Sequence, residues 1–309
     1  TNEIINVAVT PASGFTNQTI NAGKIQRDGI ELALSATPVS AGSFEWNLGI
    51  NLSKVNSKIV ELAEGVNAIV QEGGSFGTTS GVQLVHAVGE RWGQLRGGAF
   101  KMLNGQRVVD ANGRYIAEPN SYLGSVLPDW TGGMFNSLTY KSFVLNINVD
   151  FQKGGKYFSL SDHWGVFSGL MARTAGLNDK GNPVRDAVAD GGGVHVVGVT
   201  AEGQPVDTYV EAFTHFHDFR SRRIAEEHIY DLSFIKLREV SLGYRIPVSK
   251  VGALNKWLQN ATISIVARNP WLIYAENRDF DPSEISNRYG ENGQYPGSRS
   301  IGFNLKLGF

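Results

Sequence analysis

The sequence lacks several features on which common protein classes depend. It contains no cysteine, which excludes disulfides, thiolate metal sites and cysteine nucleophiles. Lys and Arg number 28 against 29 Asp and Glu, so there is no basic excess for nucleic acid or for a polybasic membrane patch. No apolar run approaches the ~20 residues of a membrane-spanning helix. Because the chain shows no signal peptide and opens at Thr1, we expect a mature protein or an internal fragment.

Apolar and polar residues alternate in three segments, 44–52, 143–151 and 301–309. Their fifteen apolar positions carry no charge, whereas the positions between them are rich in Asn, Gly and Ser. Successive side chains of a strand point to opposite faces, so each segment predicts a strand with one wholly apolar side. Weaker alternation adds four strands. The seven predicted strands span about 24–38, 43–57, 129–140, 142–153, 231–246, 260–270 and 299–309.

The alternation changes phase between Ile235 and Val240, which predicts a β-bulge near Arg238 and Glu239. Connections between the predicted strands alternate between short and long. Turns lie near 40–42 and 140–142, and the stretch 248–258 has room for one helical turn. The long connections are 58–128, 154–230 and 271–297. In an up-and-down antiparallel sheet, one end therefore has tight turns and the other has large loops, which point to function or disorder.

Two fold classes share this pattern. A transmembrane β-barrel has short periplasmic turns, long extracellular loops and tilted strands of about 9–11 residues. A soluble β-sandwich or barrel also alternates apolar and polar residues. The uncharged apolar face favours the membrane class, because one Lys or Arg there costs ~2–4 kcal/mol at mid-bilayer. Aromatic residues near strand ends, such as Trp46 and Phe151, agree with it, and Phe309 has the form of an outer-membrane assembly signal.

Seven strands do not complete a barrel. An open sheet would expose two unpaired edges in hydrocarbon, and bacterial single-chain barrels have an even number of strands from eight upward. Either further strands lie within 1–23 or the long loops, or the chain is the C-terminal part of a larger barrel. The size of the loops favours the larger barrel.

Several sequence blocks resemble those of one receptor family. The blocks are GKIQRDGIEL (23–32), PDWTGG (128–133), DLSFIKLREVSLGY (231–244), ARNPWL (267–272), DFDPS (279–283) and YPGSRSIGF (295–303). Their order and content resemble the SusC/RagA family of TonB-linked outer-membrane receptors from Bacteroidetes. The chain departs from that family at Pro270, where Leu is usual, and at Ser283, where Glu is common.

The resemblance implies an all-β fold: an antiparallel, up-and-down transmembrane barrel of about 22 strands with a plugged lumen. Residues 1–309 would form its C-terminal portion, with the plug domain, the TonB box and the earlier strands outside this chain. The resemblance also implies the bacterial outer membrane, import of oligosaccharides or peptides energised by TonB, and a SusD-like surface lipoprotein as a lid. It implies no cofactor and no enzymatic activity. The alternative is a soluble, secreted carbohydrate-binding β-sandwich, or a glycosidase that uses the acidic loop.

Two groups of polar residues are weaker site candidates. His215 and His217 would share one face of an extended segment as a metal pair, but a third ligand is missing and we predict no metal. Asp279, Asp281 and Glu284 have the composition of a Ca²⁺ or acid/base cluster, whereas the resemblance assigns Asp281 to a loop turn. We predict no catalytic or cofactor-binding residue.

Aromatic residues in the long loops are the better candidates for contact with a ligand or partner. Aromatic faces beside Asn, Asp and Arg groups suit a polar oligomer. The alternative is that these rings pack the loops against one another or against the lipoprotein. The candidates are Trp92, Tyr115, Tyr157, Trp164, Tyr209 and Tyr289.

Overall fold

The structure is a computed structural model that describes residues 2–8, 12, 14–15, 17–63, 65–71, 81–252, 257–285, 290–295 and 297–309. Its largest element is an eight-stranded sheet in which every neighbouring pair is antiparallel. In order, the strands are β1 (Asn2–Ala8), β2 (Asn17–Ala41), β3 (Phe44–Leu62), β10 (Trp130–Tyr140), β11 (Phe143–Lys153), β16 (Phe234–Ile246), β17 (Asn260–Ala275) and β19 (Ser300–Gly308). All seven predicted strands are confirmed, and β1 is an eighth.

The sequence pattern missed β1 and the beginning of β2. Ile4 and Ile5 are adjacent in β1, so this segment shows no alternation. Residues 17–23 of β2 are mostly polar and show none either. Backbone pairing defines these strands instead, with Asn6 opposite Thr19.

The strand register places apolar side chains opposite one another across the sheet. One such row runs through Leu138, Leu145, Leu242, Ile265 and Phe303 on five successive strands. Ile265 is 49% exposed and Phe303 is 80% exposed, so no described part of the chain covers this apolar face. A β-sandwich would bury that face against a second sheet, and the structure therefore excludes the sandwich alternative.

Asn136 interrupts the apolar face of β10, which is one reason why this strand alternates only weakly in the sequence. Its Cα partner on β11 is Ile147, an apolar-face residue. The side-chain Oδ1 of Asn136 accepts a hydrogen bond from the indole N–H of Trp46 at 3.1 Å. Both polar groups are thereby satisfied on a face where an unpaired one would be costly.

The predicted bulge is confirmed at Arg238. Asn148 pairs with Glu239 and the next residue, Val149, pairs with Leu237, so Arg238 has no partner opposite it. Because of the extra residue, Leu237 lies on the apolar face, while Arg238 and Glu239 both lie on the polar face. The bulge therefore reconciles the two phases of the sequence pattern.

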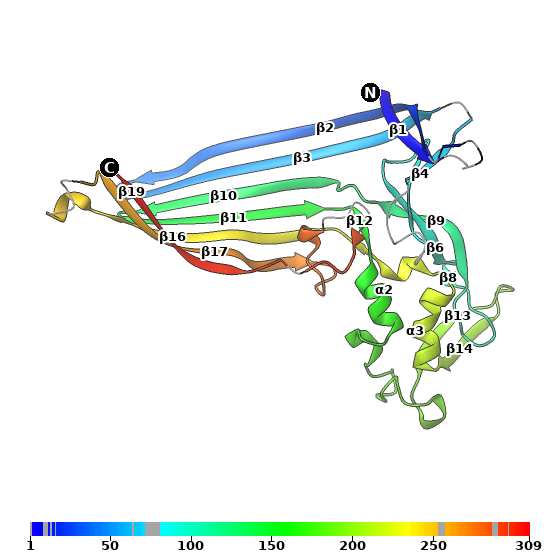
Figure 1. Ribbon diagram of the computed structural model, residues 1–309. Coiled ribbons are helices and arrows are strands. Elements are labelled where there is room, and N and C mark those ends of the chain that lie inside the picture. Colours follow the sequence, from blue (N-terminus) through cyan, green and yellow to red (C-terminus); the bar gives the residue numbers. More distant parts are fainter. Residues whose placement is uncertain are drawn as a thin grey trace.

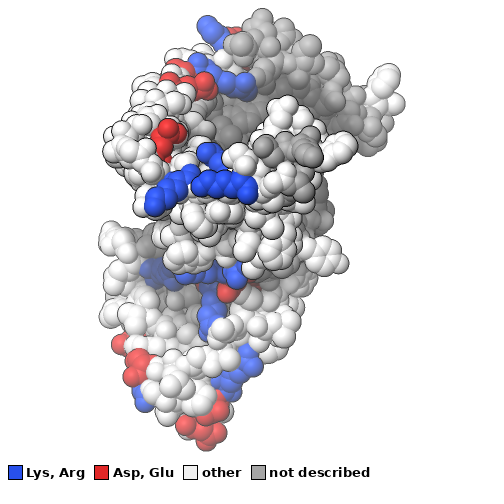
Figure 2. Space-filling view, turned by 90° about the vertical axis from the view of Figure 1, so that its left-hand side faces the viewer, with Lys and Arg blue, Asp and Glu red and all other residues white. Residues whose placement is uncertain are grey.

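The two ends of the sheet differ as the alternating connections predict. Figure 1 shows the short turns and the C-terminus at one end, and the folded connections at the other. The link from β16 to β17 holds one 3₁₀ turn, η5 (Val248–Lys250), as expected. Seen from the short-turn end, most of the surface carries no charge, and the charged side chains lie in separate groups (Figure 2). No helix in the described residues is both long and apolar enough to cross a membrane.

The long connections fold into a structured unit, which we call the loop body: the described parts of 63–129 and 154–233. It contains a four-stranded sheet of β4 (Ala68–Gln71), β5 (Gln83–Ala87), β6 (Gln94–Phe100) and β9 (Ala117–Ser125), and the small pairs β7 (Met102–Leu103) with β8 (Gln106–Arg107) and β13 (Val194–Val199) with β14 (Pro205–Val210). A third small sheet joins β12 (Lys156–Ser159) and β15 (Ile229–Asp231) to β18 (Gly290–Glu291). The helices are α2 (Leu160–Phe167), α3 (Ala212–Ser221), η2 (Ala172–Thr174), η3 (Val188–Asp190) and η4 (Ala225–His228), and η7 (Pro282–Glu284) follows β17.

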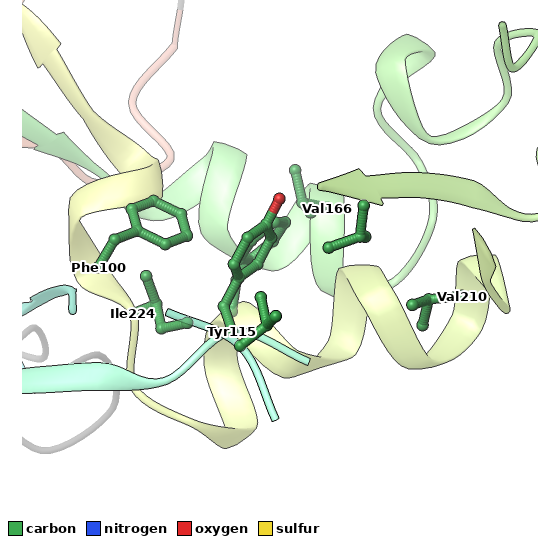
Figure 3. Close-up of a cluster of buried hydrophobic side chains, with 8 residues drawn as sticks. Phe100, Tyr115, Val166, Val210 and Ile224 are labelled. Atoms are coloured by element: carbon green, nitrogen blue, oxygen red, sulfur yellow. The ribbon is translucent and has the colours of Figure 1, made fainter. Parts of the chain in front are cut away.

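Buried apolar clusters hold the loop body together. The larger one draws residues from β6, β13, β14, α2, α3 and the segments between them, and Tyr115 lies inside it (Figure 3). The ring of Tyr115 packs edge-on against Phe100, with centroids 5.0 Å apart. The buried members of this larger cluster are Phe100, Val109, Tyr115, Val166, Val196, Val210, Phe219 and Ile224. Each fully buried apolar side chain of this size stabilises the fold by about 1.5–3 kcal/mol, and the clusters therefore hold the loop body in one folded unit.

Candidate functional site

The polar face of the sheet forms one candidate surface. A hollow of about 450 Å³ lies where Gly49 and Gly133 leave room between amide and carboxylate side chains. Asp150 accepts a hydrogen bond from Arg238 Nε at 2.7 Å at the edge of this hollow. Hydrogen-bonding groups around a recess suit a polar solute rather than an apolar one.

Lys236 joins strand β16 to the loop that follows β17. Its side chain is 2% exposed, and its ammonium group donates to Asp281 Oδ2 and Glu284 Oε1, both at 2.7 Å, and to Ser283 Oγ at 3.0 Å. Burial alone would raise the pKa of Asp281, but the hydrogen bonds from Lys236 and Ser283 and the charge of Lys236 together outweigh burial and lower that pKa. The Lys236 hydrogen bond likewise lowers the pKa of Glu284.

These contacts decide the interpretation of the acidic loop. Asp281 begins η7 by accepting the backbone N–H of Ser283 at 3.0 Å, so it forms the turn that the resemblance implied. Asp281 and Glu284 are both committed to Lys236, which leaves no free carboxylate pair for acid/base chemistry. Within the described residues, no group of three or more His, Asp or Glu has the geometry to hold a metal ion.

A buried polar centre lies in the loop body around Asp162. This carboxylate is 1% exposed and sits in the first turn of α2, whose N-cap is Ser159. Its Oδ2 accepts from His228 Nδ1 at 2.7 Å, Arg173 Nη2 at 2.7 Å and the Tyr230 hydroxyl at 2.8 Å. Burial by itself raises the pKa of Asp162, but the His228 hydrogen bond and the charge of Arg173 reverse that shift and lower it. The centre ties α2 to η2 and β15.

Two buried histidines of the loop body are held in the neutral form. His163 is 2% exposed, and neither ring nitrogen has a hydrogen-bond partner among the described residues. Burial, assisted by the charge of His228, lowers the pKa of His163 to about 4. Burial also lowers the pKa of His86 to about 4. Both groups resist protonation in the folded state.

Acidification is therefore expected to destabilise the loop body. Between pH 6.5 and about 4, the unfolded chain protonates His163 and the folded chain does not, so stability falls by about 1.4 kcal/mol per pH unit for this group. Hydrogen exchange of loop-body amides between pH 7 and 5 measures the slope. His163→Phe should make the slope of stability against pH smaller by the contribution of one protonating group.

His195 provides the matched control for this pH prediction. The hydrogen bond to Asp207 raises the pKa of His195, so this residue contributes a slope of the opposite sign. His195→Gln should therefore leave the acid-induced loss in place. An unchanged slope in His163→Phe would contradict the prediction.

Two of the six predicted aromatic contacts offer little surface in the structure. Tyr115 is 9% exposed and Tyr157 is 1% exposed, so both pack inside the loop body. Tyr289 lies outside the described residues. Packing of loops against each other, the alternative foreseen from the sequence, describes Tyr115 and Tyr157.

The other three predicted rings lie at the surface or partly so. Trp92 stacks on His86 with centroids 3.7 Å apart. Trp164 is 37% exposed. Tyr209 lies beneath Lys180, whose Nζ is 3.6 Å from the ring centroid. Ligand or partner contact by any of the six residues stays a prediction.

The structure adds a cleft between α2 and α3 that the sequence did not reveal. Its volume is about 410 Å³, and His217 stacks there between Phe167 at 4.1 Å and Phe213 at 3.9 Å. The cleft is lined mainly by Phe167, Arg185, Glu211, Phe213, Phe216 and His217. Aromatic faces with one cationic and one anionic group suit a zwitterionic or polar oligomer.

The histidine pair flagged in the sequence lies on α3 rather than in an extended segment. Two residues apart on a helix, His215 and His217 point in different directions. His215 packs against Phe219 with centroids 5.2 Å apart, whereas His217 faces the cleft. The metal-pair arrangement therefore does not form. The run of aromatic residues around 213–219 is the sequence signal that could have pointed to the cleft.

Comparison with known proteins identifies the relatives of the chain. No protein-family model matches it. A TonB-dependent receptor of Formosa agariphila is 27% identical over 99% of this chain and 31% of its own length. A second TonB-dependent receptor of that organism is 22% identical over 96% of this chain and 30% of its own. The chain is a relative of the TonB-dependent receptors.

Solved structures support the same relationship at the level of the fold. The RagAB peptide transporter superposes with a TM-score of 0.67 at 17% identity, over 98% of this chain and 31% of that chain. The RagAB peptide importer in its open-open state gives 0.69 at 16% identity, over 100% and 31%. The resemblance to the SusC/RagA receptors is thus confirmed at the level of the fold, and the open eight-stranded sheet matches a segment of the barrel of these structures. The chain spans about a third of the length of the relatives it matches.

Proposed function

We propose that this receptor segment is part of the wall of an outer-membrane nutrient importer that depends on TonB. The observation that carries the proposal is the uncovered apolar band on one face of seven paired strands, with amide and charged groups on the other. The apolar face meets lipid, the polar face meets the lumen, and the loop body lies on the extracellular side. The names of the curated relatives support this placement.

The remainder of the importer lies outside this chain in the proposal. The chain is its C-terminal portion, and about 14 further strands complete a barrel of about 22. The plug domain and the segment that contacts TonB precede it. Phe309, at the end of the last strand, acts as the assembly signal.

We propose import of peptides or oligosaccharides, with a SusD-like lipoprotein as the partner over the loop body. The fold match to a RagAB peptide transporter favours peptides. The cleft at Phe213 agrees with this choice, because Arg185 and Glu211 offer both charges that a peptide carries at its ends. No covalent chemistry is assigned to the segment, since Asp162, Asp281 and Glu284 are engaged in ion pairs.

Uptake of labelled peptides and oligosaccharides by cells that carry the full-length receptor tests the proposal. Phe213 is 72% exposed at the cleft, and Phe213→Ala should lower peptide uptake about fivefold through the loss of one aromatic contact. Tyr122→Ala removes a ring that is 47% exposed on β9 and should have no effect. Absence of the receptor from the outer membrane, or uptake of neither cargo, would refute the proposal.

A further inference from the structure

A groove of about 470 Å³ lies on the apolar face at the long-loop end of the sheet. It is lined mainly by Leu52, Trp130, Phe151, Lys153, Ile235 and Tyr274. These residues come from five neighbouring strands, β3, β10, β11, β16 and β17. The groove therefore belongs to the sheet wall and is separate from the cleft between α2 and α3.

The strand register places the groove on the same face as the apolar band. Leu52 lies opposite Gly132, Gly132 opposite Phe151, Phe151 opposite Ile235, and Ile235 opposite Tyr274. Gly132 leaves this row without a side chain at one position. The ring of Phe151 occupies the space instead, since a Cβ at 132 would lie 2.5 Å from Phe151 Cζ. The wall is thus recessed beside Phe151.

Two lysines lie at the upper rim of this recess. Lys153 is exposed and is the Cα partner of Trp130. Lys54 approaches the same indole from the other side, with its Nζ 5.1 Å from the ring centroid. Their Cα atoms are about two interstrand spacings apart, roughly 10 Å. Two flexible lysine side chains at this separation can converge on one anionic group.

No carboxylate of the described residues neutralises these lysines. Neither Lys54 nor Lys153 takes part in an ion pair among the described residues. The nearby carboxylate of Asp129 is held by Arg91 Nη1 at 2.5 Å. The rim is therefore a site of unpaired positive charge directly above an apolar recess.

We propose that this groove binds an anionic, phosphorylated lipid of the outer leaflet. An acyl chain lies in the recess along Phe151, Ile235 and Tyr274, and the headgroup phosphate lies between Lys54 and Lys153. Trp130 marks the level of the membrane interface, where indole rings are enriched. Lysine binds phosphate as a point charge. The proposal rests on the membrane placement proposed above.

Native mass spectrometry of the full-length receptor in neutral detergent, titrated with bis-phosphorylated lipid A, tests this site. The double variant Lys54→Gln and Lys153→Gln should weaken binding about 25-fold, because each lysine near an anionic surface is worth about fivefold. Lys141→Gln is the matched control. Its Nζ lies 5.3 Å over the Tyr140 ring at the short-turn end, so the same kind of cation–ring contact is removed at the opposite end of the wall.

The outcomes separate this inference from the proposed function. Equal lipid A binding by the double variant and the parent overturns the lipid site, as does equal binding of phosphatidylethanolamine with matched chains. If inorganic phosphate displaced lipid A at an equal concentration, the site would bind free phosphate rather than a lipid. That result would also overturn the lipid site. The proposed function would fail if the parent protein were absent from the outer membrane or took up neither cargo. Neither result depends on the lysine variants. Unchanged heat-modifiable mobility of the variants shows that they fold.

Discussion

Replacing Ile147 by lysine is expected to lower the stability of the membrane-inserted receptor by about 2–4 kcal/mol. Ile147 lies in the middle of β11, and its Cα partner on β16 is Val240, another apolar-face residue. In the proposed membrane placement, a charge at this level faces the hydrocarbon core without an opposite charge to pair with. Folding titrations into lipid vesicles, or the heat-modifiable fraction in outer membranes, would show the loss.

Asn148→Lys is the matched control for Ile147→Lys. Asn148 is the next residue of the same strand and points to the polar face, where its Cα partner is Glu239. A lysine there meets water and a carboxylate, so we expect a change below about 1 kcal/mol. Equal losses in the two variants would mean that the faces are assigned wrongly.

Asp162→Ala is expected to destabilise the loop body by about 3–5 kcal/mol. The change leaves the polar atoms of His228 and Tyr230 without their shared acceptor, at a cost of about 1–3 kcal/mol for each group, whereas the partly exposed Arg173 keeps its ion pair with Glu227. Because the folded-state pKa of Asp162 is lowered, its stabilisation is present at neutral pH and is lost as pH falls through that pKa. The difference between variant and parent should therefore shrink in acid.

Hydrogen exchange in α2, η2 and β15 of the full-length receptor measures this effect. Lys156→Gln is a suitable control, because the Lys156 to Asp231 ion pair is 3.4 Å long with partly exposed side chains. Such a pair is worth about 0–1 kcal/mol. If Asp162→Ala altered exchange no more than Lys156→Gln, the buried centre would not stabilise the loop body.

The binding surfaces were less visible in the sequence than the wall. Six rings were selected because they lie in long connections, yet Tyr115 and Tyr157 prove to be core residues. An aromatic residue has the same composition signal in a buried cluster as at a ligand surface, so the sequence could not separate the two. The cleft depends on α3 crossing near α2, a contact between residues about 50 positions apart.

The sequence by itself determined the strands, their apolar face and the bulge at Arg238. Side-chain direction in a strand has a period of two, so the alternation of apolar and polar residues along the sequence shows it directly. Tertiary structure alone decided that β1 is the eighth strand of the sheet, that the long connections form a folded body, and that Lys236 holds the acidic loop. These features depend on contacts between distant segments, for which local alternation leaves no trace.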